Sequence, residues 1–292
     1  MISLAAIRYR SVLALDGGPI EFIEEGELRV FGEKYFQANA QLNANLVPRR
    51  GRQVYGDADG TGINASPMVA RHIAISEALE RWAYYETAQS SNRTDFGFHV
   101  DRSSNGMAAF PGLSVQTARR AAKFEAIERF CLLNWWENRL DGQVSNTSQP
   151  GIAAISFRTP IGGIAVVVYG RSEFGFFIYG HAAAECFERA CNHALLELFR
   201  HELAIRRWRT TKDPLPPKSP YERRALFFST EEGHSIFNER LQTKSRCSMP
   251  ESELVCDREI RGPWSAYTTV WRILFRPPSE RFIEADDRYF FW

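Results

Sequence analysis

The residues of this chain that are best suited to chemistry are glutamates that recur at helical spacing. The pattern Glu-x-x-Glu-Arg occurs at residues 77–81 and again, 48 residues later, at residues 125–129. Carboxylates at positions i and i+3 lie on one face of a helix. Two such helices facing each other would gather four carboxylates, and a divalent cation would relieve their repulsion. Mg²⁺ with a nucleotide is the usual occupant of such a site.

The similarity between the two copies extends upstream of the glutamates. Eight of the sixteen aligned positions are identical, which indicates duplicated structure. A single copy is more typical of a solvated helix face with a weak ion pair, so the repeat is what favours a site. The matched upstream residues are Ser66, Ala70, Arg71 and Ala74 in the first copy, and Ser114, Ala118, Arg119 and Ala122 in the second.

A third copy, at residues 185–189, lacks the upstream match, and we expect Glu185 and Glu188 to lie at the surface. Glu197 follows in the same predicted helix, and its sequence neighbours are apolar. A charge in apolar surroundings is costly unless it is paired or binds a metal ion. Glu197 is therefore a further candidate ligand.

The composition excludes several classes of protein. The chain has 292 residues, 44% of them hydrophobic and 24% charged, which is ordinary for a globular protein with a substantial core. Its net charge of +1 gives no general attraction to nucleic acid or to a membrane surface. The five cysteines lack the spacing of a zinc site or a disulfide scaffold. No apolar stretch approaches 18 residues, so we expect a soluble, cytoplasmic protein.

Local signals place the glutamates on three long helices, expected at residues 66–87, 114–138 and 183–209. Ser66 and Pro67 read as an N-cap followed by proline in the first helical position. Three β-like runs, at 152–157, 163–169 and 173–179, are typical of a meander. Strands between helices favour an α+β fold over a helical bundle.

The remaining segments carry weaker signals. We expect a strand near residues 28–31, loops at 51–65 and 88–98, and a turn-rich segment at 99–113. Residues 141–150 read as a polar linker, and residues 210–222, which contain four prolines, as a linker before a C-terminal segment of mixed character.

The motifs resemble those of the YcaO family. The resemblance covers residues 56–201, where the motifs occur in the family's order. It implies a YcaO-like α+β fold with an internal pseudo-repeat, in which mixed or antiparallel sheets pack with helices, and a single domain over residues 1–292. The motifs are Ser76, Glu77, Glu80 and Arg81; a Ser-Asn-Gly-Met-Ala segment containing Asn105, followed by Glu125, Glu128 and Arg129; and Gly180-His181-Ala182 followed by Glu197.

Carried over residue by residue, the resemblance implies that ATP is bound through Mg²⁺. The chain contains no G-x-x-x-x-G-K-[ST] motif, so the nucleotide would be held without a P-loop. His193 stands where the family tends to carry glutamine or another polar donor, four residues before Glu197, and would contact the γ-phosphate. The implied Mg²⁺ ligands are Glu77, Glu125, Glu128 and Glu197, and the other implied nucleotide contacts are Ser76, Glu80, Asn105 and Arg129.

The implied activity is ATP-dependent phosphorylation of the oxygen of a peptide backbone amide. The products would be an azoline, a thioamide or an amidine in a ribosomal peptide or protein. His181, beside the implied site, is a candidate substrate contact. The partners implied are the peptide or protein substrate and an E1-like leader-binding protein or a TfuA-like protein, without nucleic acid or membrane; a homodimer is plausible on the same grounds.

Two alternatives were weighed against this activity. The shortened architecture and His193 favour, as one alternative, a degenerate module that binds nucleotide or peptide and supports a partner protein. The sequence also ends in residues 286–292 without the Pro-x-Pro-x-Pro tail of azoline-forming members, which counts against heterocycle formation. A carboxylate-bridged di-metal oxidase is disfavoured because it needs Glu-x-x-His on two helices. This chain has that motif once, from Glu231 to His234, in a polar stretch.

Overall fold

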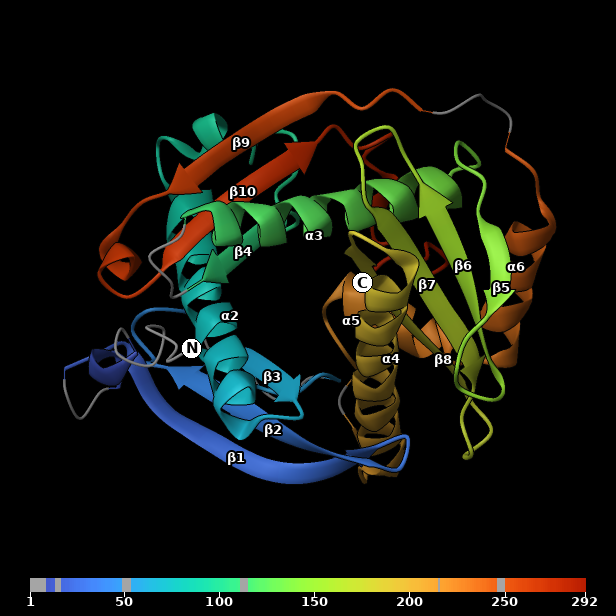
Figure 1. The fold of residues 1–292 in the computed structure, drawn as a ribbon, viewed down its shortest axis with the longest axis horizontal. Coiled ribbons are helices and arrows are strands. Elements are labelled where there is room, and N and C mark those ends of the chain that lie inside the picture. Colours follow the sequence, from blue (N-terminus) through green and yellow to red (C-terminus); the bar gives the residue numbers. More distant parts are fainter. Residues whose placement is uncertain (1–8, 14–16, 49–53, 111–114, 215, 246–249) are drawn as a thin grey trace. The chain divides into compact units, whose positions relative to one another are not determined.

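Helices and antiparallel sheets alternate along the chain, which confirms the predicted α+β class (Figure 1). The computed structural model describes residues 9–13, 17–48, 54–110, 115–214, 216–245 and 250–292. The chain divides into two compact units. The first comprises Met1–Arg50, Asp57–Ala126 and Leu254–Phe275, and the second comprises Gly51–Gly56, Ile127–Glu253 and Arg276–Trp292.

In the first unit, one helix packs against a three-stranded sheet. The sheet has the order β1 (Ile20–Val30), β2 (Glu33–Leu42) and β3 (Gly60–Asn64), and the helix is α2 (Pro67–Gln89). As predicted, α2 begins after Ser66 with proline in its first turn. Its buried face is rich in alanine, which allows the helix to approach the sheet closely. The buried alanines are Ala70, Ala74, Ala78 and Ala83.

A second sheet of the first unit joins segments that are far apart in the sequence. Its order is β4 (Met107–Phe110), β10 (Thr269–Phe275) and β9 (Leu254–Ile260). Helix α3 (Val115–Trp136) begins in this unit and ends in the second unit. Its first half packs Ala122 and Ala126 against strands β4 and β10. Strand β10 therefore supports the helix that carries the second Glu-x-x-Glu-Arg copy.

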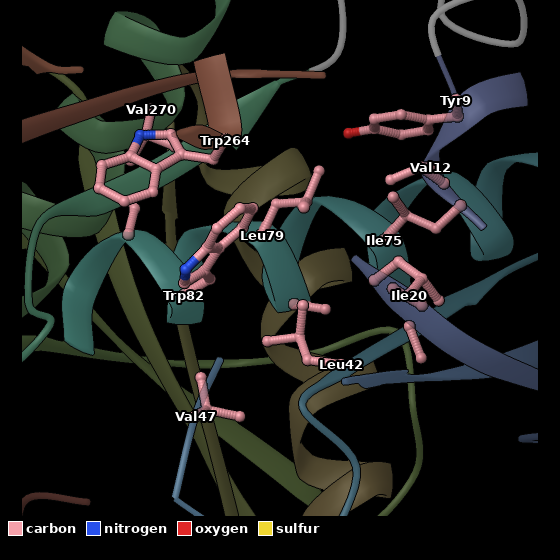
Figure 2. Close-up of a cluster of buried hydrophobic side chains, with 14 of the residues drawn as sticks. Tyr9, Val12, Ile20, Leu42, Val47, Ile75, Leu79, Trp82, Trp264 and Val270 are labelled. Carbon is pink, nitrogen blue, oxygen red and sulfur yellow. The ribbon is translucent and has the colours of Figure 1, made fainter. Parts of the chain in front are cut away.

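A hydrophobic cluster joins helix α2 to its sheet and to the segment before β10 (Figure 2). Ile20 and Leu42 from the sheet pack with Leu79 of α2. Trp82 of α2 meets Trp264 edge to face, with ring centroids 5.7 Å apart. Such aromatic pairs contribute about 0.5–1.5 kcal/mol beyond their buried area. This cluster fixes the helix that carries the first Glu-x-x-Glu-Arg copy.

The second unit contains a four-stranded antiparallel meander covered by a long helix. Val166 and Ile178 of the sheet pack with Leu198 of the helix. Val54, which precedes the first unit's strand β3, is buried in the same cluster. The strands are β5 (Gln143–Asn146), β6 (Ile152–Arg158), β7 (Ile164–Arg171) and β8 (Phe177–Ala184), and the helices are α4 (Phe187–Thr210), α5 (Pro220–Phe228) and α6 (Glu231–Gln242).

Several predicted loops are strands or helices. Residues 60–64, predicted as loop, form β3, because Gly60 and Gly62 allow the strand to approach α2 closely. The predicted turn-rich segment contains β4, the predicted linker at 141–150 contains β5, and α5 begins inside the predicted proline-rich linker. The strand predicted at 28–31 is the end of the longer β1. Strands of four or five residues, as β3, β4 and β5 are, offer too short a run of alternating side chains to mark a strand in sequence.

The last strand of the meander was predicted too early, and the start of the helix after it was predicted at Ala183. Strand β8 runs from Phe177 to Ala184, and α4 starts at Phe187. The run Ala182–Ala184 favours a helix by propensity alone. Pairing with β7 overrides that preference, with Ala182 opposite Val166.

A repeated strand–helix arrangement relates the two units. A β-carbon added to Gly60 would lie 2.1 Å from the carbonyl oxygen of Ala74, and one added to Gly180 would lie 2.1 Å from that of Ala194. Gly60 and Gly180 differ by 120 in number, as do Ala74 and Ala194. The same offset relates Glu77 to Glu197, so each of these two glutamates lies one turn after an alanine that contacts the strand. The repeat in the sequence relates helix α2 to helix α3. The close contacts of Gly60 and Gly180 instead relate the pair β3 and α2 to the pair β8 and α4.

No helix in the part of the chain that the structure describes is both long enough and apolar enough to cross a membrane.

Candidate functional site

Glu77 of α2 is fixed to the strand beneath it. Its Oε2 accepts a hydrogen bond of 2.9 Å from the backbone N–H of Thr61, and its Oε1 lies 3.6 Å from Nη2 of Arg81. Arg81 also donates to the carbonyl oxygen of Ala58. The glutamate and the arginine of the first motif copy are therefore held by β3 and by the residues before it.

Glu80, one turn further along α2, lies among like charges. Burial, then the nearby carboxylates of Glu125 and Glu77, raise the pKa of Glu80 well above its usual value, although the backbone N–H of Ala109 donates to it. Both Glu77 and Glu125, the predicted Mg²⁺ ligands of the first unit, therefore interact electrostatically with Glu80. This crowding is the electrostatic situation that a bound cation relieves.

Two predicted nucleotide contacts of the first unit already have partners. The Oγ of Ser76 lies 2.7 Å from the hydroxyl of Tyr9. Asn105 is buried, and its Nδ2 donates to Oδ2 of Asp101 over 3.0 Å. The residue after it, Gly106, has a φ of +70°, and a β-carbon there would lie 3.4 Å from that of Ala126, next to Glu125 on α3. Asn105 therefore lies close to the helix turn that carries Glu125.

Glu128, on the second half of α3, is paired inside the second unit. The Nδ1 of His181 lies 2.8 Å from its Oε1, and Nε of Arg129 lies 3.5 Å from the same oxygen. The side chain of Glu128 is 12% exposed. Burial acts to raise its pKa, but the charges of His181 and Arg129 and the hydrogen bond from His181 outweigh burial and lower it. Glu128 is therefore held as a carboxylate.

Arg129 reaches the last residues of the sequence. Its Nη1 donates to the carbonyl oxygen of Trp292 over 3.1 Å, and its guanidinium lies over the ring of Phe291. The ring of Trp292 packs near His181 and near His201. The predicted nucleotide contact Arg129 is thus next to an aromatic segment that the sequence analysis did not connect with the site.

Glu197 does not occupy the apolar surroundings that its sequence neighbours indicated. Its side chain is 45% exposed, and its Oε1 lies 2.8 Å from Nη1 of Arg200. The flanking leucines point to other faces of α4, since neighbours in sequence are about 100° apart around a helix. His193, one turn earlier on α4, is exposed. Glu197 is therefore accessible to a ligand and is not the buried charge that its sequence neighbours predicted.

The third motif copy lies at the surface, as predicted. Glu185 and Glu188 are exposed, and Glu185 pairs with Arg189 across one helical turn.

The sequence did not predict a hydrogen-bonded tyrosine–histidine pair whose histidine lies one turn beyond Glu197 on α4. The hydroxyl of Tyr55 lies 3.2 Å from Nδ1 of His201, which is one turn beyond Glu197 on α4. Burial and then the charge of His181 lower the pKa of His201 to about 3, so this imidazole is neutral. No motif signals this pair, because Tyr55 is distant from α4 in sequence.

The donor set suits Mg²⁺ in type, because the ion prefers hard oxygen ligands such as carboxylates. The fit rests on Glu80, whose pKa is raised by burial first and then by the nearby carboxylates of Glu125 and Glu77. Within the described residues, however, no three His, Cys, Asp or Glu side chains are grouped as they would be around a metal ion. The ligand set Glu77, Glu125, Glu128 and Glu197 therefore stays a prediction.

Comparison with known proteins gives a fold match without a sequence match. Neither a protein-family model nor a curated protein matches this chain. The structure of YcaO from Methanopyrus kandleri bound with AMPPCP and Mg²⁺ is similar to it with a TM-score of 0.60 and 14% identity, over 96% of this chain and 91% of that chain.

Two further solved structures are similar. The E. coli microcin synthetase McbBCD complex with pro-MccB17 bound matches with a TM-score of 0.54 and 14% identity, over 87% of this chain and 86% of that chain. A heterocyclase in complex with substrate and cofactor matches with a TM-score of 0.60 and 12% identity, over 93% of this chain. The match covers 51% of the heterocyclase chain, about half its length. Together these matches show that the chain has a YcaO-like fold.

Proposed function

We propose that this chain, which has a YcaO-like fold, binds Mg-ATP and uses it to activate a backbone amide of a peptide or protein. The observation that carries the proposal is the crowding of carboxylates around Glu80 in a fold shared with a structure that contains AMPPCP and Mg²⁺. Two of the similar structures contain a peptide precursor or a substrate, which supports a peptide as the second substrate.

In the proposed reaction, the amide oxygen takes the γ-phosphoryl group of ATP, and ADP leaves. A Ser, Thr or Cys side chain of the peptide, or an external sulfur or nitrogen donor, then forms the new bond to the amide carbon as phosphate departs. The product is an azoline, a thioamide or an amidine. Phosphoryl transfer of this kind depends chiefly on positioning and on charge stabilisation.

Residues of this chain are suited both to position the reactants and to stabilise the charge of the phosphates. We propose that Glu77, Glu125, Glu128 and Glu197 would hold Mg²⁺, which when bound would offset the charge of the phosphates. Glu128 is suited to this because its carboxylate is ionised, with a lowered pKa. Glu197 is suited because it is accessible. Ser76, Glu80, Asn105, Arg129 and His193 are the proposed nucleotide contacts.

Calorimetric titration of Mg-ATP tests this proposal. We expect micromolar binding that requires Mg²⁺, and a loss of at least about tenfold in affinity for Glu125→Gln and for Glu197→Gln. Glu188→Gln, on the exposed face of α4, is the matched control and should bind as the unaltered protein does. Equal affinity in all four proteins would refute the ligand assignment.

A second candidate function is a module that binds nucleotide or peptide without turnover and supports a partner protein. It is favoured by one observation: Ser76, Glu128 and Arg129 already have protein partners. Release of ADP and phosphate in the presence of a peptide substrate and its partner protein would decide between the two. Binding of Mg-ATP without any such release would favour the module.

A further inference from the structure

We propose that Asn105 presents its side-chain oxygen to the cation of the bound Mg-nucleotide, and that Asp101 and Arg272 hold it in that orientation. This inference rests on the proposed function, because it assumes that the nucleotide is bound with Mg²⁺. It assigns a specific atom and a direction of hydrogen bonding to Asn105, and it assigns positioning roles to two residues outside the sequence motifs.

The orientation of Asn105 follows from its neighbour. The amide lies 3.0 Å from Oδ2 of Asp101, and an ionised carboxylate can only accept hydrogen bonds. The atom facing Asp101 must therefore be Nδ2. Asp101 is itself fixed, because its Oδ1 accepts from the backbone N–H and the hydroxyl of Ser103. The Oδ1 of Asn105 is the remaining amide atom, and no donor among the described residues contacts it.

The loop that carries Asn105 is attached to strand β10 at two points. Nη2 of Arg272 donates to the carbonyl oxygen of Asp101 over 2.8 Å. The backbone N–H of Ile273 donates to the carbonyl oxygen of Gly106, also over 2.8 Å. A β-carbon at Gly106 would lie 1.8 Å from the carbonyl oxygen of Ile273, so the loop needs glycine there. The backbone of Asn105 therefore lies between two fixed points, and its amide is held by the hydrogen bond to Asp101.

Arg272 is a buried charge whose position calls for a functional reason. It is 0% exposed, and within the described residues its Nε and Nη1 have no hydrogen-bond partner. Its guanidinium lies 3.6 Å from the centroid of the Phe98 ring. Burying a charge with unused donors costs free energy. The groups that offset this cost are Asp101 and, after it, Cys256, Tyr84 and Glu125.

The surroundings of Asn105 favour a cation as the ligand of its free oxygen. Gly106 packs beside Ala126, next to Glu125, and Ala109 in the following strand donates to Glu80. An amide oxygen cannot donate to phosphate oxygens, which are themselves acceptors. It can bind Mg²⁺ or a water on Mg²⁺, an ion that keeps several waters when it binds to proteins. Asn105 thus adds a neutral oxygen to a group of carboxylates.

The test measures how much Mg²⁺ is needed for ATP binding. Calorimetric titration of ATP at increasing Mg²⁺ gives the Mg²⁺ concentration for half-maximal binding. We expect Asn105→Ala to raise this concentration at least fivefold, and Asn192→Ala, an exposed asparagine on α4, to leave it unchanged. Asp101→Asn should raise it as well, because an amide at residue 101 allows Asn105 to turn its nitrogen outward.

Arg272→Met tests the positioning role, because its effect should act through Asn105. It should raise the Mg²⁺ requirement in the unaltered protein and have no further effect when Asn105 is already alanine. A residue that only stabilised the fold would have the same effect in both backgrounds. Additive effects would therefore refute the positioning role, and Asp101→Asn serves the same comparison if Arg272→Met does not fold.

The outcomes separate this inference from the proposed function. If the unaltered protein binds Mg-ATP and Asn105→Ala needs no more Mg²⁺ than it does, the role of Asn105 is wrong and the proposed function stands. If the unaltered protein binds no Mg-ATP, both are wrong.

Discussion

The Nδ1 atom of His181 lies 2.8 Å from Oε1 of Glu128, and this contact joins the meander of the second unit to its part of helix α3. Because the carboxylate accepts, Nδ1 carries the hydrogen. The glutamate belongs to the repeated motif, whereas the histidine is 53 residues further along the chain. The contact therefore brings the histidine of the Gly180-His181-Ala182 motif to a glutamate of the second Glu-x-x-Glu-Arg copy.

Removal of this histidine should destabilise the protein. His181→Ala leaves a nearly buried carboxylate without its hydrogen bond, at a cost of about 1–3 kcal/mol at pH 7. The pKa of Glu128 is lowered in the folded state, so the stabilisation is present above the carboxyl group's ordinary pKa and is lost as the pH falls through the lowered value. Urea unfolding at pH 7 and pH 4 measures both effects. His99→Ala, at an exposed histidine, is the control, and a cost independent of pH would contradict the prediction.

Glu80 should show the opposite dependence on pH. Its pKa is raised in the folded state, so the folded protein loses stability as the pH rises from the ordinary carboxyl value to the raised one. Glu80→Gln should therefore stabilise the protein by about 1 kcal/mol or more at pH 8, and little at pH 4.5. Thermal unfolding at the two pH values measures this. Glu86→Gln, exposed on the same helix, should change little at either pH, and destabilisation by Glu80→Gln at pH 8 would contradict the prediction.

The two glycines of the repeated arrangement should be equally intolerant of a side chain. Gly60→Ala and Gly180→Ala each place a β-carbon 2.1 Å from a helix carbonyl oxygen. Strand and helix must then separate, at a cost of about 1–3 kcal/mol or more. Gly26→Ala in β1, where a β-carbon meets nothing within 4 Å, is the control. Denaturant midpoints compare the three variants, and a tolerated Gly180→Ala would argue against the repeat.

Arg224 should be essential for the C-terminal residues of the second unit. It is 0% exposed and donates to four backbone carbonyl oxygens of residues 282–291. Arg224→Met leaves these oxygens without a donor and should cost about 3–5 kcal/mol. Arg223→Gln removes a partly exposed ion pair with Asp287 and should cost less than about 1 kcal/mol. Similar unfolding midpoints for the two variants would show that Arg224 does not have this role.

The long helices were predictable because their signals are local. Ser66 and Pro67 mark the start of α2, and the observed helix begins there. The motif glutamates Glu77 and Glu125 lie on helices, as their spacing indicated. The α+β class follows from strand-like runs between such helices, and the YcaO-like fold agrees with the resemblance read from the motifs.

The short strand β4 was not predictable, because its pairing depends on a distant partner. Strand β4 pairs with β10. Met107 of β4 lies opposite Arg272 of β10, which follows it by 165 residues in the sequence. No short window of sequence contains both strands. Glycines that read as loop in sequence serve close packing at Gly60 and Gly62.

The sequence by itself determined which residues carry charge and which helices carry them, because helix spacing and end signals act within a few residues. Only the tertiary structure decided the state of each charge. Glu128 is held ionised by His181 and Arg129, Glu80 is buried near Glu125, and the half-exposed side chain of Glu197 pairs with Arg200. The physical reason is that the pKa and accessibility of a carboxylate depend on the groups and solvent around it in space, and folding brings these groups from distant parts of the chain.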